Sequence, residues 1–357
     1  MRIDTFIFLM FICLGILLLL LNIIRPLEIF YIVEWKTIFS LFYLMVIVNV
    51  MKDTKFLDYL SLKMLEKSRR VFLSLITLTL LLSSIITNDV SLFVIIPLTL
   101  IINKHVKMSL RDLEKLIIFE GISANIGSAL TPIGNPQNLF LFHFYNIGIL
   151  EFIINMIPFE IFGILAILPF LEFKKYDTEI HIDIKFKKEW IFYMLSFILI
   201  LLCIFGYLNF MYIFPLIIVI LMYKRVKVDY LFLLTFIFLF VDIEGLKKIG
   251  IINIFSIKCN NIMLMIYSSL LSQIISNVPA AVLLSHLYKN WLPIAYGVNV
   301  GGNGTLIASF ANLIVLRLSN GNVGVGRFLL IGGIIYIMHL TALILYFIVY
   351  YYFIGSY

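Results

Sequence analysis

Residues 71–103 read VFLSLITLTLLLSSIITNDVSLFVIIPLTLIIN, and this segment decides how the rest of the chain is interpreted. Its 33 residues are mostly apolar, yet Thr87, Asn88 and Asp89 stand near its centre. Basic segments flank it at 52–70 and 104–115, and basic loops stay on the cytoplasmic side of a membrane. The segment must therefore enter and leave on one side, as two helical arms of about 16 residues, roughly 24 Å each. Such short arms predict a re-entrant hairpin, whose tip must be packed in protein or line a wet cavity.

The composition of the whole chain also indicates a bilayer protein. Hydrophobic residues make up 62% of the 357 residues and charged residues only 13%, whereas a soluble domain carries about 25% charged residues. The net charge of +7 comes from Lys and Arg in short loops, so it indicates membrane orientation and no nucleic-acid partner. Three scattered cysteines give neither a disulfide framework nor a metal-ligand spacing.

The loops predict nine spans and a second hairpin at 263–288. The spans lie near 5–24, 36–51, 116–145, 150–172, 190–208, 211–223, 229–241, 291–316 and 328–354. The segment 242–262 is expected to be a loop. With the N-terminus inside and the C-terminus outside, 21 of the 27 Lys and Arg residues fall on the cytoplasmic side, as the positive-inside rule requires of a plasma-membrane protein.

The chain repeats itself in three places and in the same order. Ser83–Val90 matches Ser272–Pro279, and the segment around Asn125-Ile-Gly127 matches the one around Asn299-Val-Gly301. Ahead of these in each half, Val33-Glu34-Trp35 precedes one span and Val228-Asp229-Tyr230 precedes another. Because the two hairpins fall on opposite sides of the membrane, the repeats are expected to be inverted, with a binding site near the midplane.

We therefore predict an all-α polytopic membrane fold with three parts. Residues 1–172 form the first repeat, with hairpin 71–103 and broken span 116–145. Residues 173–208 supply a linker and an extra span. Residues 209–357 form the second repeat, with hairpin 263–288 and broken span 291–316.

The hairpin tips are the first candidate site. Thr87, Asn88 and Asp89 stand at one tip, and Ser276 and Asn277 at the other. An asparagine at membrane depth needs partners for one carbonyl and two N–H donors. Hydroxyl, amide and backbone oxygens suit Na⁺, so a sodium site is expected at Thr87, Asn88, Gly134, Ser276 and Asn277. The alternative is that the two asparagines only hold the hairpin turns.

The broken spans are the second candidate site. Prolines and glycines crowd 125–138, and glycines crowd 299–305; each costs a helix about 1 kcal/mol for Gly or 3 kcal/mol for Pro. These spans must unwind, and unwound backbone at membrane depth belongs at a cavity. Small-residue packing between helices explains the glycines but not the amide side chains. The predicted substrate-binding residues are Asn88, Thr131, Asn135, Asn138, Asn277, Thr305 and Asn312. The predicted ion-coupling residues are Thr87, Asn88, Asp89, Asn125, Gly134, Ser276, Asn277 and Asn299.

Three acidic residues, Asp89, Glu120 and Glu160, lie in or near the predicted spans. Asp89 is the single carboxylate at a predicted tip, where it could take up a proton, neutralise a bound cation or cap a helix. Glu120 and Glu160 are expected at the membrane interface. The sequence carries no nucleotide-binding loop, metal cluster or nucleophile–base pair, so we expect no enzyme activity and no cofactor beyond the coupling ion, Na⁺ or H⁺.

These motifs resemble one known superfamily. Thr87-Asn88-Asp89-Val90, Ile133-Gly134-Asn135-Pro136-Gln137-Asn138 and Ser276-Asn277-Val278-Pro279 are similar to signature segments of the ion transporter superfamily. It includes arsenite permeases, citrate–metal symporters, sodium/dicarboxylate symporters and a group of sodium/proton antiporters. The resemblance implies a homodimer with a scaffold and an elevator-type transport domain, with Na⁺ and substrate at the hairpin asparagines and unwound loops.

The tips also depart from one branch of that superfamily. Sodium/dicarboxylate members carry Ser-Asn-Thr at both tips, and this chain has Asp89 and Val278 in place of the final Thr. The tips are closer to the arsenite permease branch. The expected function is secondary transport of a small anion or oxyanion, arsenite-like or carboxylate, coupled to Na⁺ or H⁺. The alternatives are a sodium/proton antiporter that uses Asp89 and a membrane scaffold or receptor that does not transport.

Overall fold

The structure is a computed structural model that describes residues 3–65, 70–172 and 185–353. Every regular element in these ranges is a helix, and no strand occurs among them. The predicted all-helical fold is therefore confirmed. Of the predicted cytoplasmic loops, residues 66–69 and most of 173–189 lie outside the described residues.

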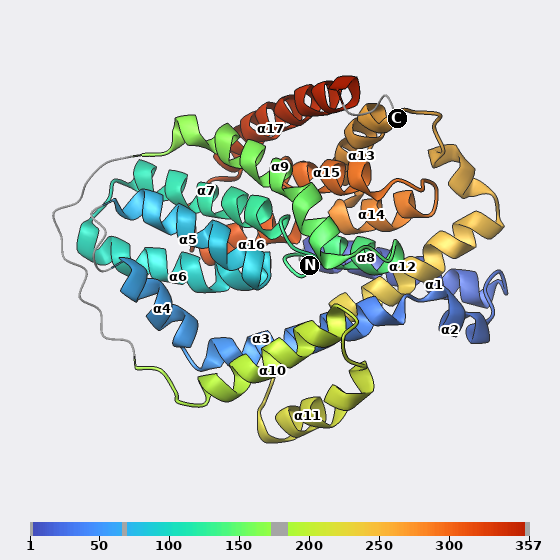
Figure 1. The fold of residues 1–357 in the computed structure, drawn as a ribbon, viewed down its shortest axis with the longest axis horizontal. Coiled ribbons are helices and arrows are strands. Elements are labelled where there is room, and N and C mark those ends of the chain that lie inside the picture. The colour runs from blue at the N-terminus through green and yellow to red at the C-terminus, as the bar shows by residue number, and fades with distance from the viewer. Residues whose placement is uncertain (1–2, 66–69, 173–184, 354–357) are drawn as a thin grey trace.

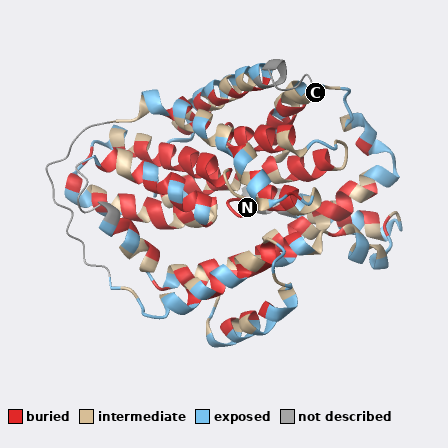
Figure 2. Ribbon diagram, viewed as in Figure 1, coloured by how far each residue is buried: buried red, intermediate tan, exposed pale blue. Residues whose placement is uncertain are grey.

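Four helices are long and apolar enough to cross a membrane: α3 (Trp35–Asp53), α6 (Asn88–Val106), α9 (Ile149–Ile167) with the turn that follows it, and α17 (Val325–Phe353). Shorter apolar helices include α1 (Ile3–Leu20), α5 (Val71–Ile85), α10 (Trp190–Ile204), α11 (Phe210–Tyr223) and α13 (Asn261–Ile275). Leucines and isoleucines cover the exposed faces of α9 and α17 (Figure 2). A surface of this kind suits lipid, so the chain is a multi-pass membrane protein.

One layer of the molecule pairs helices from distant parts of the chain. Helix α1 packs along α12 (Tyr230–Lys248), and α3 packs along α10, with α11 beside them (Figure 1). The short helices α2 (Ile29–Ile32) and α4 (Phe56–Leu65) stand at opposite ends of α3. We call α1, α3, α10, α11 and α12 the scaffold layer.

Two helical hairpins lie beside this layer. The first consists of α5 and α6, and the second of α13 and α14 (Asn277–Ser285). In the first, Thr87 ends the turn and accepts a hydrogen bond from the Val90 N–H at 3.4 Å. In the second, a single residue separates the arms, because Ser276 ends α13 and precedes α14. Both turns fall at the tips that the sequence predicts.

Each hairpin packs against a helix that breaks and resumes. The first pair is α7 (Leu110–Ser128) and α8 (Pro136–Phe144), and the second is α15 (Trp291–Gly301) and α16 (Phe310–Leu318). Helix α8 restarts with Pro136, which needs no N–H partner at the first turn, and with Asn135 as its N-cap. The irregular segments 129–135 and 302–309 thus lie between helix ends, as the prolines and glycines predict.

One predicted boundary is wrong. The segment 242–262 was expected to be a loop, but α12 continues to Lys248 and a short 3₁₀ turn follows at Ile251–Phe255. Asp242 and Glu244 therefore lie within a helix. The charged residues at 242–248 suggested a loop, yet the helix extends because α1 covers its apolar face as far as Gly245.

Candidate functional site

The two hairpin tips are attached to the two broken helices by equivalent hydrogen bonds. The Asn88 backbone N–H donates to the Gly134 carbonyl at 2.9 Å, and the Asn277 N–H donates to the Ala308 carbonyl at 2.9 Å. The members of each pair are related by the offsets of 189 and 174 residues that separate the repeated motifs. The same contact is therefore built twice from corresponding positions.

Gly134 is required at its position by close backbone contact. A Cβ atom there would lie 2.1 Å from the Ser128 carbonyl oxygen. The tight turn brings the Gly134 carbonyl to the first hairpin, and no larger residue fits without moving that backbone.

Asparagine side chains join the two broken helices to each other. The Asn125 amide donates to Asn312 Oδ1 at 3.0 Å, and the Asn299 amide donates to Asn138 Oδ1 at 2.7 Å. Asn299 corresponds to Asn125 and Asn312 to Asn138 by the same offset of 174 residues. The two bonds are thus equivalent: in each, the asparagine at the end of the first helix of one repeat donates to the asparagine at the start of the second helix of the other repeat.

The remaining polar atoms of these asparagines are also paired. Asn299 Oδ1 accepts from the amides of Asn135 at 2.9 Å and Gln137 at 3.1 Å. Asn125 Oδ1 accepts from the Ser309 hydroxyl at 3.1 Å and from the Asn88 amide at 3.4 Å. Buried amides that satisfy one another hold the unwound segments in one conformation.

Asn138 and Asn312 each fasten the unwound segment before their own helix. The Asn138 amide donates to the Ala129 carbonyl at 3.1 Å. The Asn312 amide donates to the Gly302 and Thr305 carbonyls at 2.8 Å each. Thr131 and Thr305 tie these segments to the hairpins through the Ser84 and Gln273 carbonyls, at 2.7 and 3.2 Å.

A cavity of about 70 Å³ lies where both tips face the scaffold layer. Its polar wall comes from the tips and the starts of α8 and α16, and its apolar wall from α1 and α12. The polar lining residues are Asn88, Asp89, Gln137, Thr235, Ser276, Asn277 and Ser309. The volume exceeds the ~15 Å³ that one water molecule needs, so a polar ligand of a few atoms can enter it.

The predicted site residues divide into two groups. Asn88, Asp89, Ser276 and Asn277 line the cavity. The others lie behind this wall as parts of the hydrogen-bonded network or of the turns: Thr87, Asn125, Thr131, Gly134, Asn135, Asn138, Asn299, Thr305 and Asn312. Of the predicted residues, those at the tips are the ones in a position to touch a ligand.

Several cavity residues were not among those predictions. Gln137 and Ser309 reach the wall from the starts of α8 and α16, and Thr235 from the scaffold. Gln137 could have been predicted, because it stands between Asn135 and Asn138 in a short segment rich in amide side chains. Thr235, Phe236 and Phe11 belong to ordinary apolar spans, so only the packing of α1 and α12 against the tips identifies them.

Ser276 has a backbone conformation that few residues other than glycine adopt. Its φ is +74° and its ψ is 158°, and such a conformation costs about 1–3 kcal/mol. The single-residue turn imposes it. The Ser276 hydroxyl contacts Asn277 Oδ1 at 3.4 Å and the Ala308 carbonyl at 3.3 Å, so the strained residue lies at the cavity edge.

The charge of the cavity lining is unusual for an anion site. Neither Lys nor Arg lines it, and Asp89 is its one carboxylate. Among the described residues, no group of three His, Cys, Asp or Glu side chains could hold a metal ion. Apart from the Asp89 carboxyl group, the polar groups that a ligand can contact are hydroxyls, amides and backbone groups, which suit a hard monovalent cation or a hydroxylated solute.

The prediction for Glu120 is wrong. Its side chain is fully buried, and the Thr99 hydroxyl donates to one of its oxygens, so it does not lie at the membrane interface. The packing of α6 and α7 removes it from solvent. Glu160 has intermediate exposure.

The fold and these features define a polytopic membrane transporter. The chain matches the model of the citrate transporter family over residues 5–290, and it belongs to that family. This agrees with the resemblance to the ion transporter superfamily.

The relatives are transporters and membrane proteins. An uncharacterised transporter of Methanocaldococcus jannaschii is 85% identical over 97% of this chain and 98% of its own length. The inner membrane protein YbiR of Escherichia coli is 31% identical over 81% of each chain. A relative named as transporter arsB in Dictyostelium discoideum is 30% identical over 39% of this chain and 26% of its own.

Proposed function

We propose that this protein is a secondary active transporter of a small oxyacid, and that it binds its substrate in the cavity between the two hairpin tips. The observation that carries the proposal is the convergence of Asn88 and Asn277 on one cavity from two separate hairpins. Amide groups that line one cavity at membrane depth can offer both N–H donors and carbonyl acceptors to a polar ligand. Most of the other amides are held behind the wall by the network, whereas Asn88 and Asn277 keep only long contacts of their side chains with other side chains, at 3.4 Å each, and line the cavity.

The chemistry of the lining favours a small, neutral or weakly charged oxyacid. A citrate-like substrate would bring several carboxylates, which proteins normally bind with Arg or Lys. The lining has none of these and carries Asp89 instead. Hydroxyl groups of an arsenite-like acid would instead donate to Asp89 and to the amide oxygens.

The coupling ion is Na⁺ or H⁺. The Ser276 hydroxyl and the tip amides offer oxygen ligands for Na⁺, and Asp89 offers a proton carrier. The presence of Asp89 on the wall also supports a second candidate function, a sodium/proton antiporter without an organic substrate. The two functions differ in whether an oxyacid moves.

We further propose that transport follows an elevator mechanism. The hairpins and broken helices form a hydrogen-bonded unit, and they meet the scaffold layer at the cavity through apolar residues such as Phe11, Phe232 and Phe236. Apolar contacts can slide without leaving polar groups unpaired. The contacts of His143 on α8 with the Thr37 hydroxyl of α3 and the Ile204 carbonyl of α10, at 3.2 Å each, would break as the unit moves. The proposal includes a homodimer in the plasma membrane, with the N-terminus in the cytoplasm and the C-terminus outside.

Counterflow in proteoliposomes tests this function. Vesicles loaded with unlabelled arsenite or citrate take up the labelled solute, with and without a Na⁺ gradient and with and without a pH gradient. We expect arsenite counterflow that one of the gradients accelerates. Exchange of Na⁺ for H⁺ with no movement of either solute would establish the antiporter instead.

A further inference from the structure

Asp242 is a carboxyl group buried inside the scaffold layer. It lies on α12, and its side chain is 1% exposed. Neither of its carboxyl oxygens has a hydrogen-bond partner among the described residues. Glu120 is the other described acid that has a buried oxygen without a partner, Oε2, but its Oε1 accepts a hydrogen bond from the Thr99 hydroxyl. Asp242 is therefore the less satisfied of the two, and none of the site contacts described above uses it.

Asp242 lies close to the cavity along the seam between α1 and α12. Leu239 lines the cavity and precedes Asp242 by three residues, which is about 4.5 Å along a helix axis. On α1, Phe11 lines the cavity and Gly15 follows one turn later. A Cβ atom on Gly15 would lie 3.0 Å from Asp242 Oδ1. The carboxyl group and Gly15 are thus one turn further along the two helices whose side chains close the cavity.

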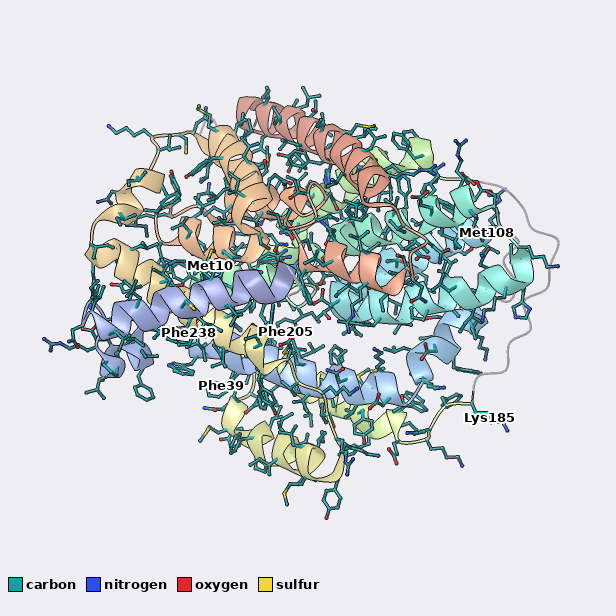
Figure 3. The ribbon with its side chains drawn as sticks, turned by 180° about the vertical axis from the view of Figure 1, so that it is seen from behind. Met10, Phe39, Met108, Lys185, Phe205 and Phe238 are labelled. Carbon is teal, nitrogen blue, oxygen red and sulfur yellow. The ribbon has the colours of Figure 1, made fainter. Side chains whose placement is uncertain are left out.

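Gly15 makes the space for this carboxyl group. A Cβ atom there would also lie 2.3 Å from the Phe238 ring. Figure 3 labels Phe238 on this seam, together with Met10 of α1. A larger residue at position 15 would collide with the Phe238 ring and crowd the Asp242 carboxyl group, so the glycine leaves room for both.

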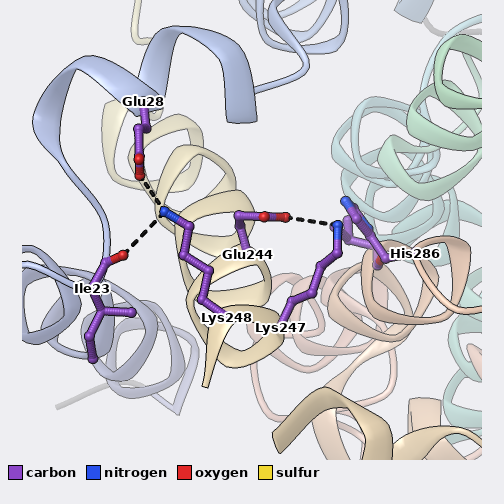
Figure 4. A network of polar contacts seen from close by, with 7 residues as sticks. Ile23, Glu28, Glu244, Lys247, Lys248 and His286 are labelled. Atoms are coloured by element: carbon purple, nitrogen blue, oxygen red, sulfur yellow. Dashed lines mark hydrogen bonds and ion pairs between the residues drawn. The ribbon is translucent and has the colours of Figure 1, made fainter. Parts of the chain in front are cut away.

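The charged groups near this end of α12 are paired with one another and not with Asp242. Lys248 donates to Glu28 at 2.5 Å, and Lys247 contacts Glu244 at 3.4 Å, with His286 beside them (Figure 4). The hydrogen bond from Lys248 holds the pKa of the Glu28 carboxyl below its usual value. The helices packed on α12 carry these further titratable or charged groups among the described side chains: Cys13, Tyr31, Lys36, Tyr43, Lys52 and Asp53. None of them is hydrogen-bonded to Asp242.

An ionised carboxylate without a partner is very unfavourable in such a place, so the neutral acid is the stable form. We propose that Asp242 is a proton-binding site of the scaffold layer, separate from the hairpin tips. The proton is bound as the O–H of the carboxylic acid. It leaves as that O–H bond breaks and a water molecule in the cavity accepts H⁺, which requires Leu239 and Phe11 to move aside.

The proposal deepens the proposed function, because a proton held on the scaffold and exchanged with the cavity would couple H⁺ to transport. Its test does not depend on transport. Infrared difference spectra of the purified protein at neutral pH compare the wild type with Asp242→Asn. The matched control is Asp229→Asn, which removes an exposed aspartate at the start of the same helix.

We expect the wild-type-minus-Asp242→Asn spectrum to show the carbonyl stretch of a protonated acid. The Asp229→Asn difference, in which the same change of side chain is made at an exposed position, should lack that band. Carboxylate bands in the Asp242→Asn difference would overturn the proposal.

A second measurement does not alter Asp242. Protein labelled with ¹³C in the aspartate carboxyl groups is prepared with Asp89→Asn, so that the one carboxylate of the cavity lining is removed. The protonated-acid band of aspartate should persist at neutral pH, and its absence would also overturn the proposal. If neither spectrum shows the protonated-acid band but oxyacid counterflow is normal, the proton site is excluded and the proposed function stands.

Discussion

The side-chain amide of Asn299 donates to Oδ1 of Asn138 at 2.7 Å, across the interface between the two broken helices. The corresponding residues, Asn125 and Asn312, make the same bond at 3.0 Å. The two bonds connect the repeats in both directions. They account for amide side chains that would otherwise be unsatisfied at membrane depth.

This relationship predicts thermodynamic coupling between Asn138 and Asn299. Asn299→Ala removes partners from Asn138, Asn135 and Gln137, and should lower the free energy of unfolding by roughly 1–3 kcal/mol. Asn138→Ala should do the same, and the double variant should lose less than the sum, with a coupling of roughly 0.5 kcal/mol or more. Unfolding in mixed micelles measures the cycle. Strict additivity would show that the bond contributes nothing.

The tip asparagines should be essential for transport but not for folding. We expect Asn88→Ala and Asn277→Ala to abolish counterflow, because each removes an amide from the cavity wall. Their melting temperatures should change little compared with Asn299→Ala. Asn253→Ala, which alters an exposed residue in the turn after α12, is the matched control. Full activity of either tip variant would show that its amide only holds the hairpin.

Gly134→Ala should weaken the contact between the first tip and the first broken helix. The new methyl group would collide with the Ser128 carbonyl, and overpacking of this kind destabilises by about 1–3 kcal/mol. Since the Gly134 carbonyl would move away from the Asn88 N–H, transport should fall as well. The melting temperature and counterflow of this variant, compared with Gly326→Ala at a position with open space, measure both effects. Equal behaviour of the two variants would exclude a structural role for the Gly134 turn.

Asp89→Asn should remove the pH dependence of uptake in the range where the wild type shows it. Asn cannot take up or release a proton, yet it keeps the size and hydrogen-bonding groups of the side chain. Uptake rates of the two proteins over a series of pH values provide the comparison. An unchanged pH profile would make Asp89 a structural residue of the α6 N-terminus.

The architecture was readable from the sequence where polarity interrupts an apolar run. Thr87-Asn88-Asp89 and Ser276-Asn277 marked the turns, and Pro136 with Gly134 two residues before it marked a helix break. These signals are local, because a hydroxyl, amide or proline at membrane depth has few compatible conformations. The inversion of the repeats and the domain boundaries stay predictions.

The sequence did not show which polar residues line the cavity and which belong to the hydrogen-bonded network behind it. Asn88 and Asn138 are both asparagines in apolar surroundings, but one lines the cavity and the other is satisfied by Asn299 and backbone carbonyls. That difference depends on contacts between residues more than 150 positions apart. The burial of Asp242 was not predicted for a related reason, because it depends on the space that Gly15 leaves on a helix far away in the sequence.

Substrate protection of a single cysteine tests the location of the site most directly. Val278→Cys places a thiol on the cavity wall in a protein whose Cys13, Cys203 and Cys259 are replaced by serine. Ser256→Cys, outside the cavity, is the control. We predict that saturating amounts of the transported oxyacid slow alkylation of the thiol at position 278 and leave that at position 256 unchanged. Equal alkylation at position 278 with and without a solute that the protein transports would contradict a binding site between the hairpin tips.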